Sequence, residues 1–510
     1  MTRQASAAAP ISASRPSRRR RTVFKGCAAA MALALSACAG TTTPPVTPGQ
    51  AGPITAQETQ YGAEAHPQLL AEFGGKYNAP VANYVERVGK NIAAQSGLAS
   101  ARDAYTVTLL NSPVNNAFAI PGGYVYTTRA LVGLMDNEAE LAAVLGHEVG
   151  HVAARHSQTR QQAAQQNSLL GVLGSVVSGV LLGNSQLGQL GQQLAMQGSQ
   201  LLTLKYSRSQ ELQADELGIA YLSSAGYDPM AMATVLESLA QQNSLDARLA
   251  GPADNAVLPE WASTHPDPAS RVREAVQDAQ GKPGTVINRD AFLTAIDGML
   301  YGDDPQQGVV DGTSFIHPEL RFAFDAPSGY FLVNGTRAVS ITGQSGKGQL
   351  TSAAYSGDLG NYVGQVFAQL AGDGQAQIQP GQIQRTTVNG IPAAYATARA
   401  NTGNGTVDVT VFAYEFSNNQ AFHFVTITQA GQAGVFNSMY QSMRRISATQ
   451  AAAVEPRRID VVTVKRGDTL QGLANRMAYD NGKLERFLVL NSLQQDSVLQ
   501  PGQKVKLIVY

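Results

Sequence analysis

The sequence predicts an α+β protein of several domains, and three observations support this. A chain of 510 residues is too long for one compact hydrophobic core. Helical patterning dominates from about residue 67 to 230, whereas alternating strands with Gly, Asn and Pro turns dominate 312–447. The last fifty residues read as strand, helix, helix and strand. We therefore expect a mainly helical domain, a β-rich α+β domain and a βααβ module.

The first 37 residues have the composition of an export signal. They hold seven Arg and Lys residues and no acidic residue, and they end in the apolar run CAAAMALALSA. This run is too short to form a stable membrane-spanning helix. The following "LSAC", which ends at Cys38, resembles a bacterial lipobox and implies a lipid anchor on Cys38; a plain signal peptide is the alternative. Aspartate directly after the cysteine would suggest retention in the inner membrane. Ala39 stands at that position, which favours the inner leaflet of the outer membrane, facing the periplasm.

Charge and cysteine content limit the partners and the redox chemistry of the exported chain. Without the signal, 30 basic and 37 acidic residues remain, a net charge of −7. An acidic chain gives no support to a nucleic-acid partner. Cys27 and Cys38 are the only cysteines, so the exported part can form no internal disulfide.

Composition divides the remaining chain into six segments. We expect a flexible tether at 38–60, a helical domain at 61–285, a linker at 286–311, a sandwich-like α+β domain at 312–447, a linker at 448–460 and a terminal module at 461–510. Within the helical domain, 168–183 is apolar for about sixteen residues. A buried or groove-covering helix is expected there, with a mobile lid or a membrane-dipping segment as the alternative.

The helical domain contains the sequence "GHEVGH" at residues 146–151. On a helix, His147 and His151 lie one turn apart on the same face, so both can bind one metal ion. Glu148 lies about 100° round the helix and can reach a water molecule, which suits a general base. The motif therefore predicts a zinc-dependent hydrolase site.

A third ligand must come from elsewhere in the chain. The extension HExxHxxGxxH is excluded, because Ala154 and Ser157 stand at its last two positions. "ELQAD" offers Glu211 as a ligand on a second helix and Asp215, one turn on, as an acceptor for a ligating histidine. A solvated acidic helix face is the alternative interpretation.

Four ordered motifs together resemble metallopeptidase family 48 over about residues 61–280. They are "NAFAIPGGYVYTTRAL", "ELAAVLGHEVGHVAARHS", "SRSQELQADELG" and "STHPDPASR". Soluble periplasmic lipoproteins of the BepA and LoiP type are the closer analogy. The resemblance implies a gluzincin fold that holds one Zn²⁺ on His147, His151 and Glu211. It also implies an edge strand that pairs with an extended substrate, formed by Asn116, Ala117, Phe118 and Ala119.

Two further histidines, His265 and His156, are candidates for a role at the metal centre. In some periplasmic relatives a histidine like His265 occupies or gates the open position of zinc, so a gate or a transition-state role is one interpretation. A simple turn residue is the other. His156 lies five residues after His151 and off the metal face, which predicts a buried, hydrogen-bonded residue rather than a ligand.

The terminal pattern "VVTVKRGDTLQGLANRM" to "LQPGQKVKLIV" resembles a LysM domain. This resemblance implies binding to peptidoglycan, with Gly467, Asp468, Thr469 and Asn491 as glycan-binding candidates. A degenerate module used only for packing is the alternative. The 312–447 domain faintly resembles PsbP-type sandwiches, and its role is not predicted.

These expectations combine into one function. The sequence predicts a zinc metalloendopeptidase of the bacterial envelope, with proteins and peptides as substrates, above all misfolded or misassembled periplasmic and outer-membrane proteins. A latched assembly chaperone on the same fold is the first alternative. A cell-wall hydrolase is the second, although the HxH motif of familiar wall-directed metallopeptidases is absent.

Overall fold

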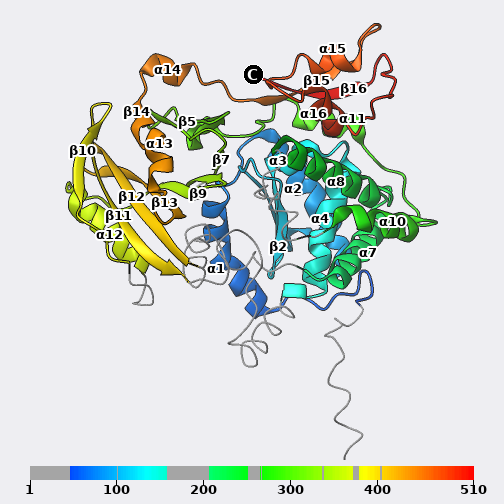
Figure 1. Ribbon diagram of the computed structural model, residues 1–510. Coiled ribbons are helices and arrows are strands. Elements are labelled where there is room, and N and C mark those ends of the chain that lie inside the picture. The colour runs from blue at the N-terminus through cyan, green and yellow to red at the C-terminus, as the bar shows by residue number, and fades with distance from the viewer. Residues whose placement is uncertain are drawn as a thin grey trace, which may run out of the picture. The chain divides into compact units, whose positions relative to one another are not determined.

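The computed structural model describes residues 46–99, 101–157, 206–250, 265, 267–335, 338–371, 378–402 and 405–510 (Figure 1). The predicted signal peptide, Cys38 and the apolar segment 168–183 lie outside the described residues. Within the described ranges, no helix has the length and apolar character needed to cross a membrane.

A small sheet opens the helical domain. Strands β1 (Thr106–Leu110), β2 (Ala117–Ile120) and β3 (Tyr124–Thr128) lie in the order β1-β3-β2, so β2 is an edge strand. A Pro-Gly-Gly turn at 121–123 joins β2 to β3. Gly122 has a φ of 97°, and an added Cβ there would lie 2.6 Å from the carbonyl oxygen of Glu58. Only glycine fits this left-handed, crowded position.

Helices surround this sheet and supply the predicted site. They are α1 (Ala56–Glu72), α2 (Pro80–Ala93), α3 (Arg129–Leu134), α4 (Glu138–Ala153), α7 (Arg208–Ser224), α8 (Ala231–Ala250) and α10 (Pro268–Ala279). Helix α4 is capped by Asn137, and α7 starts with a capping box between Ser207 and Gln210.

Glycines let α4 and α7 approach closely. An added Cβ on Gly150 of α4 would lie 3.0 Å from the carbonyl oxygen of Ala214, and one on Gly218 of α7 would lie 3.0 Å from the amide nitrogen of His147. Larger side chains would push the helices apart. Because α4 and α7 lie so close, side chains about sixty residues apart in the sequence can meet between these two helices.

Most of the segment expected as a linker at 286–311 instead belongs to folded domains. Its helix and the chain up to Met299 pack into the core of the helical domain, and 309–311 form a strand of the four-stranded sheet. The helix is α11 (Arg289–Ile296), whose Phe292, Leu293 and Ile296 are fully buried. Apolar side chains spaced three and four residues apart give this short helix one buried face, a signal that the flanking Pro and Gly residues masked. The expected tether is also shorter, because Ala51 is buried and α1 begins at Ala56.

The β-rich domain is built on a seven-stranded antiparallel sheet in the order β10-β11-β12-β13-β9-β8-β7. Its strands are β7 (Phe331–Asn334), β8 (Val339–Gly343), β9 (Gly346–Ser352), β10 (Gln384–Val388), β11 (Ile391–Thr402), β12 (Gly405–Ser417) and β13 (Gln420–Gln429). Helix α12 (Leu359–Ala371) packs on one face of the sheet.

An aromatic core lies on the other face of that sheet. It joins the sheet to α13 (Asn437–Ser442) and to a four-stranded sheet, β14-β6-β5-β4. The four strands are β4 (Val309–Asp311), β5 (Ser314–His317), β6 (Phe322–Asp325) and β14 (Arg444–Arg445). Helix α13 is only six residues long.

The terminal module has the predicted βααβ order. It comprises β15 (Arg458–Thr463), α15 (Leu470–Ala474), α16 (Lys483–Leu490) and β16 (Lys504–Val509), and β15 pairs antiparallel with β16. The expected linker at 448–460 contains a short helix, α14 (Ala448–Ala452), and the first residues of β15.

This module shares a hydrophobic core with the helical domain. Ile459, Phe487 and Leu507 belong to the same buried cluster as Leu131 and Phe292. The backbones also join, because Ile459 exchanges hydrogen bonds with Gly298 and Met299 over 2.8 and 2.9 Å. The terminal module is therefore packed into the fold rather than held on a free linker.

Lys506 of β16 adds a buried charge to this interface. Its ammonium donates to the carbonyl oxygens of Gly133, Leu134 and Met135 over 3.1, 3.1 and 2.6 Å, and it lies 3.2 Å from a carboxylate oxygen of Asp136. These carbonyls end α3, where a cation is favourable. Lys506 thus fixes the short turn that leads into α4.

Candidate metal centre

The three predicted ligands meet between α4 and α7. The Nε2 atoms of His147 and His151 lie 3.0 Å apart. A carboxylate oxygen of Glu211 lies 3.4 Å from Nε2 of His151, and its other oxygen lies 3.7 Å from Nε2 of His147. All three side chains are buried. Their donor atoms, with one of His265, lie within 4.8 Å of one another.

The contact between His147 and Asp215 leaves Nε2 of His147 available to bind a cation. Its Nδ1 lies 2.8 Å from Oδ1 of Asp215, which as a carboxylate can only accept, so the proton is on Nδ1 and Nε2 keeps its lone pair. The Nδ1 of His151 lies within hydrogen-bond distance of Nδ1 of His156, 2.8 Å away. The two Nε2 atoms, 3.0 Å apart, are close enough to bind one cation together. The spacing suits tetrahedral zinc, for which about 3.3 Å is expected.

Glu148 lies beside this cluster as the sequence predicts. It is buried, and burial raises the pKa of its carboxyl group. Its Oε1 lies 3.5 Å from Nε2 of His265 and accepts no hydrogen bond from any residue in the described ranges. A buried carboxylate oxygen without a donor beside a metal site is placed to accept a proton from water.

His265 lies inside the centre and not at an exposed turn. Its side chain is 2% exposed, and its Nδ1 lies 3.1 Å from Oε1 of Glu211 and 3.3 Å from Nε2 of His147. Burial alone would lower its pKa, but Glu211 and Glu148 outweigh burial and raise it. The ring therefore reaches the position that a fourth ligand would take.

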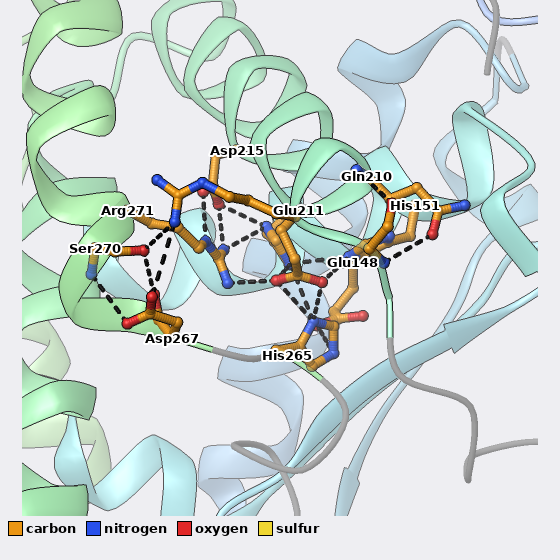
Figure 2. A network of polar contacts seen from close by, with 12 residues as sticks. Glu148, His151, Gln210, Glu211, Asp215, His265, Asp267, Ser270 and Arg271 are labelled. Carbon is orange, nitrogen blue, oxygen red and sulfur yellow. Dashed lines mark hydrogen bonds and ion pairs between the residues drawn. The ribbon is translucent and has the colours of Figure 1, made fainter. Parts of the chain in front are cut away.

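Arg271 of α10 is a member of this site that the sequence did not predict. Figure 2 shows it between Asp215 and Glu211. Its Nε and Nη2 lie 2.7 and 2.5 Å from the two oxygens of Asp215, and its Nη1 pairs with Glu211. Burial alone would raise the pKa of both carboxyl groups. His265 and Arg271 together lower the pKa of Glu211, and Arg271 and His147 together lower the pKa of Asp215. The signal was an arginine six residues after His265 in "HPDPASR".

Tyr206 is a second residue that sequence reasoning missed. Its ring stacks on His151 with 3.7 Å between centroids, and it lies 5.2 Å from the ring of His265. The face of the His151 ring is thus fixed by packing. Tyr206 sits one residue before the cap of α7, and no spacing rule pointed to it.

The predicted substrate strand corresponds to β2 and the residue before it. Ala117, Phe118 and Ala119 lie in β2. Asn116 directly precedes this strand, and its backbone N–H donates to Oγ1 of Thr128 over 3.1 Å. All four residues are buried, and β2 contacts α4. Substrate pairing at this strand stays a prediction.

The four glycan-binding candidates have structural roles in the terminal module. Gly467 has a φ of 96°, Asp468 accepts from the amide of Lys465 over 2.7 Å, and Thr469 caps α15. Asn491 is buried, and its amide bonds Phe487 and both backbone groups of Lys506. Glycan contacts by these residues stay predictions, and burial disfavours that of Asn491.

The zinc-ligand pattern on paired helices is matched by a known family. Residues 80–279 match the model described as peptidase family M48. The chain contains a peptidase family M48 domain. Residues 462–507 match the LysM domain model. The M48 match and the buried His147, His151, Glu211 and His265 group are together consistent with one bound zinc ion.

Curated relatives align over the M48 domain. The chain is 34% identical to a beta-barrel assembly-enhancing protease of Yersinia pestis over 244 residues, which cover 46% of this chain and 47% of the relative. It is 31% identical to the mitochondrial metalloendopeptidase OMA1 of Schizosaccharomyces pombe, covering 45% of this chain and 64% of that one. It is 36% identical to metalloprotease LoiP of Escherichia coli, covering 25% and 48%.

The aligned part limits what these relatives show. The chain spans about half the length of the beta-barrel assembly-enhancing proteases that it matches. Among solved structures, cyanobacterial PsbP from Synechocystis aligns at a TM-score of 0.22 and 11% identity, which carries no argument about the β-rich domain.

Proposed function

We propose that this protein is a zinc-dependent endopeptidase of the bacterial cell envelope that cleaves misfolded or misassembled periplasmic and outer-membrane proteins. The observation that carries the proposal is the convergence of His147, His151 and Glu211 next to Oε1 of Glu148, which accepts no hydrogen bond from the described residues. A zinc ion bound here supplies a Lewis acid that polarises a scissile carbonyl and makes water more acidic.

Glu148 performs the proton transfers in this proposal. Its buried carboxylate takes a proton from the attacking water and delivers it to the leaving amine, so that no charged amide nitrogen is expelled. The raised pKa of Glu148 suits a group that must be protonated for part of the cycle. Strand β2 binds the substrate backbone by strand addition, which selects extended conformation more than sequence and therefore suits unfolded proteins.

A casein-cleavage assay on the full chain tests this role. Glu148→Gln keeps the size and burial of the side chain but cannot accept the proton, so we expect zinc content to be retained and cleavage to be lost. The matched control is Glu237→Gln, an exposed carboxylate on α8, which should leave cleavage unchanged. Full activity of Glu148→Gln would remove the proposed mechanism.

A second candidate function rests on the position of His265. Its Nδ1 lies within 3.3 Å of atoms of Glu211 and His147, which is where water must enter. A latched protein of this kind would act mainly as an assembly chaperone. Increased casein cleavage by His265→Ala supports a latch, complete loss supports a transition-state role, and an unchanged rate contradicts both.

The proposed location in the envelope rests on two attachments. Lipidated Cys38 would hold the chain to the outer membrane, and the LysM domain would bind peptidoglycan. Because the LysM domain shares a core with the M48 domain, point variants test it better than truncation. Asp468→Asn keeps the hydrogen bond to Lys465 and should weaken peptidoglycan pull-down of the full chain, whereas Asp480→Asn, on an exposed loop between α15 and α16, should not.

The cell-wall hydrolase is the weaker alternative. LysM domains accompany such enzymes, but the residues that could hold the metal ion lie within the stretch that matches the M48 peptidase model. Zymography on wall material beside the casein assay separates the two substrates. Clearing of wall material with no casein cleavage would favour the hydrolase.

A further inference from the structure

His156 lies just beyond the end of α4, turned back toward the metal centre. Arg155 has a φ of 51°, a left-handed conformation that is uncommon outside glycine. Its side chain is held by Glu58, 3.2 Å away, and by the carbonyl oxygen of Pro53. This turn reverses the chain after α4. His156 is thereby fully buried next to His151.

The ring of His156 connects a zinc ligand to a second side chain on α7. Its Nδ1 lies 2.8 Å from Nδ1 of His151, and its Nε2 lies 3.0 Å from Oε1 of Gln213. Gln213 is two residues after the ligand Glu211 and is half-buried. The path therefore runs from the half-buried amide of Gln213 through His156 to Nδ1 of His151, the ring nitrogen away from the metal centre.

The order of donors along this path follows from the amide oxygen of Gln213, which faces Nε2 of His156. An amide oxygen can only accept, so Nε2 of His156 carries a proton and Nδ1 of His156 keeps its lone pair. That lone pair can only accept, so Nδ1 of His151 is the donor. Nε2 of His151 is then left unprotonated, as a zinc ligand must be.

We propose that His156 and Gln213 form a positioning relay that selects the metal-binding tautomer of His151. Neither residue touches the ion. Asp215 performs the same task for His147 as a charged acceptor, with a contact of 2.8 Å. The His151 side uses a neutral relay, so the buried centre gains no further negative charge beyond Glu211, Glu148 and Asp215. The inference rests on the proposed zinc function.

Substitutions at Gln213 test the relay, because this position is only half-buried and its side chain can change from an acceptor to an apolar group or a donor at similar size. Gln213→Glu keeps an acceptor, Gln213→Met removes it at similar size, and Gln213→Lys replaces it with a donor. The readout is the zinc dissociation constant of the full chain, measured by chelator competition, together with the visible spectrum of the cobalt-substituted protein.

The relay predicts an order of zinc affinities. Gln213→Glu should bind zinc as tightly as the parent or tighter, and Gln213→Met should bind it about tenfold more weakly. Gln213→Lys should lose up to about a hundredfold, because it turns His156 into a donor that faces the donor of His151. His156→Phe, which removes both contacts at similar volume, should match Gln213→Lys and shift the cobalt spectrum.

The outcomes separate this inference from the proposed function. A parent protein that binds no zinc overturns the proposed function, and the relay with it. If the parent binds zinc and the zinc dissociation constants of all Gln213 variants lie within about twofold of the parent's, the relay alone is overturned. Equal weakening of zinc binding by Gln213→Glu, Gln213→Met and Gln213→Lys also overturns the relay alone. Should His156→Phe fail to fold, the Gln213 series still decides.

Discussion

Arg271 grips Asp215 with two parallel hydrogen bonds, Nε to Oδ2 at 2.7 Å and Nη2 to Oδ1 at 2.5 Å. Both side chains are at most 2% exposed. The same guanidinium pairs with Glu211, a proposed zinc ligand. One buried arginine therefore orients Glu211 and also the carboxylate behind His147, a second proposed ligand. A point charge such as lysine could not do this with equal geometry.

Removing this arginine should be costly. Arg271→Met leaves two buried carboxylates without their partner, and we expect a loss of about 3–5 kcal/mol in the free energy of unfolding of the zinc-free protein. Urea denaturation measures it. Arg208→Met is the matched control, because Arg208 pairs with Glu274 at the surface and should cost at most about 1 kcal/mol. Equal small losses for both variants would contradict the assigned role.

The packing of the LysM domain predicts that the peptidase cannot fold well without it. Lys506→Met removes the cation from three carbonyl oxygens and Asp136, so we expect about 3–5 kcal/mol of destabilisation in urea. Lys504→Met, whose partner Asp290 lies 3.9 Å away near the surface, should change little. A soluble, fully active chain that ends at residue 457 would show the module to be independent.

Glu140 predicts a pH dependence of stability. Burial, with the charge of Asp136, raises its pKa to about 7 from 4.5. The folded state therefore favours the protonated form, so its contribution is present below about pH 4.5 and is lost as the pH rises through 7. Relative to Glu140→Gln, which does not titrate, the parent should lose about 3 kcal/mol in unfolding free energy between pH 4.5 and 8. A difference independent of pH would disprove the assignment.

The sequence could point to the three proposed ligands because two of them lie one helical turn apart and the third belongs to a family motif. His147 and His151 follow from helical spacing, and Glu211 follows from a carboxylate motif on a second helix with a known family pattern. The strands around Gly122 and the βααβ order of the last fifty residues also follow from local alternation and turn residues.

What the sequence did not reveal depends on packing between distant segments. Arg271 joins the site only because α10 lies against α7, and Tyr206 reaches His151 only once α7 is docked on α4. The shared core of the LysM and M48 domains likewise depends on contacts across more than three hundred residues, such as Lys506 with Gly133. The residues at 286–311 looked like a linker because a single short apolar face is a weak signal without its partner.

The central claim is that one zinc ion binds His147, His151 and Glu211. Anomalous diffraction at the zinc edge, on crystals of the zinc-loaded chain, tests it most directly. We predict one peak about 2.0–2.1 Å from the Nε2 atoms of His147 and His151 and about 2.0–2.2 Å from a carboxylate oxygen of Glu211. Absence of a peak at this centre, or ligation through Nδ1 of either histidine, would contradict the account.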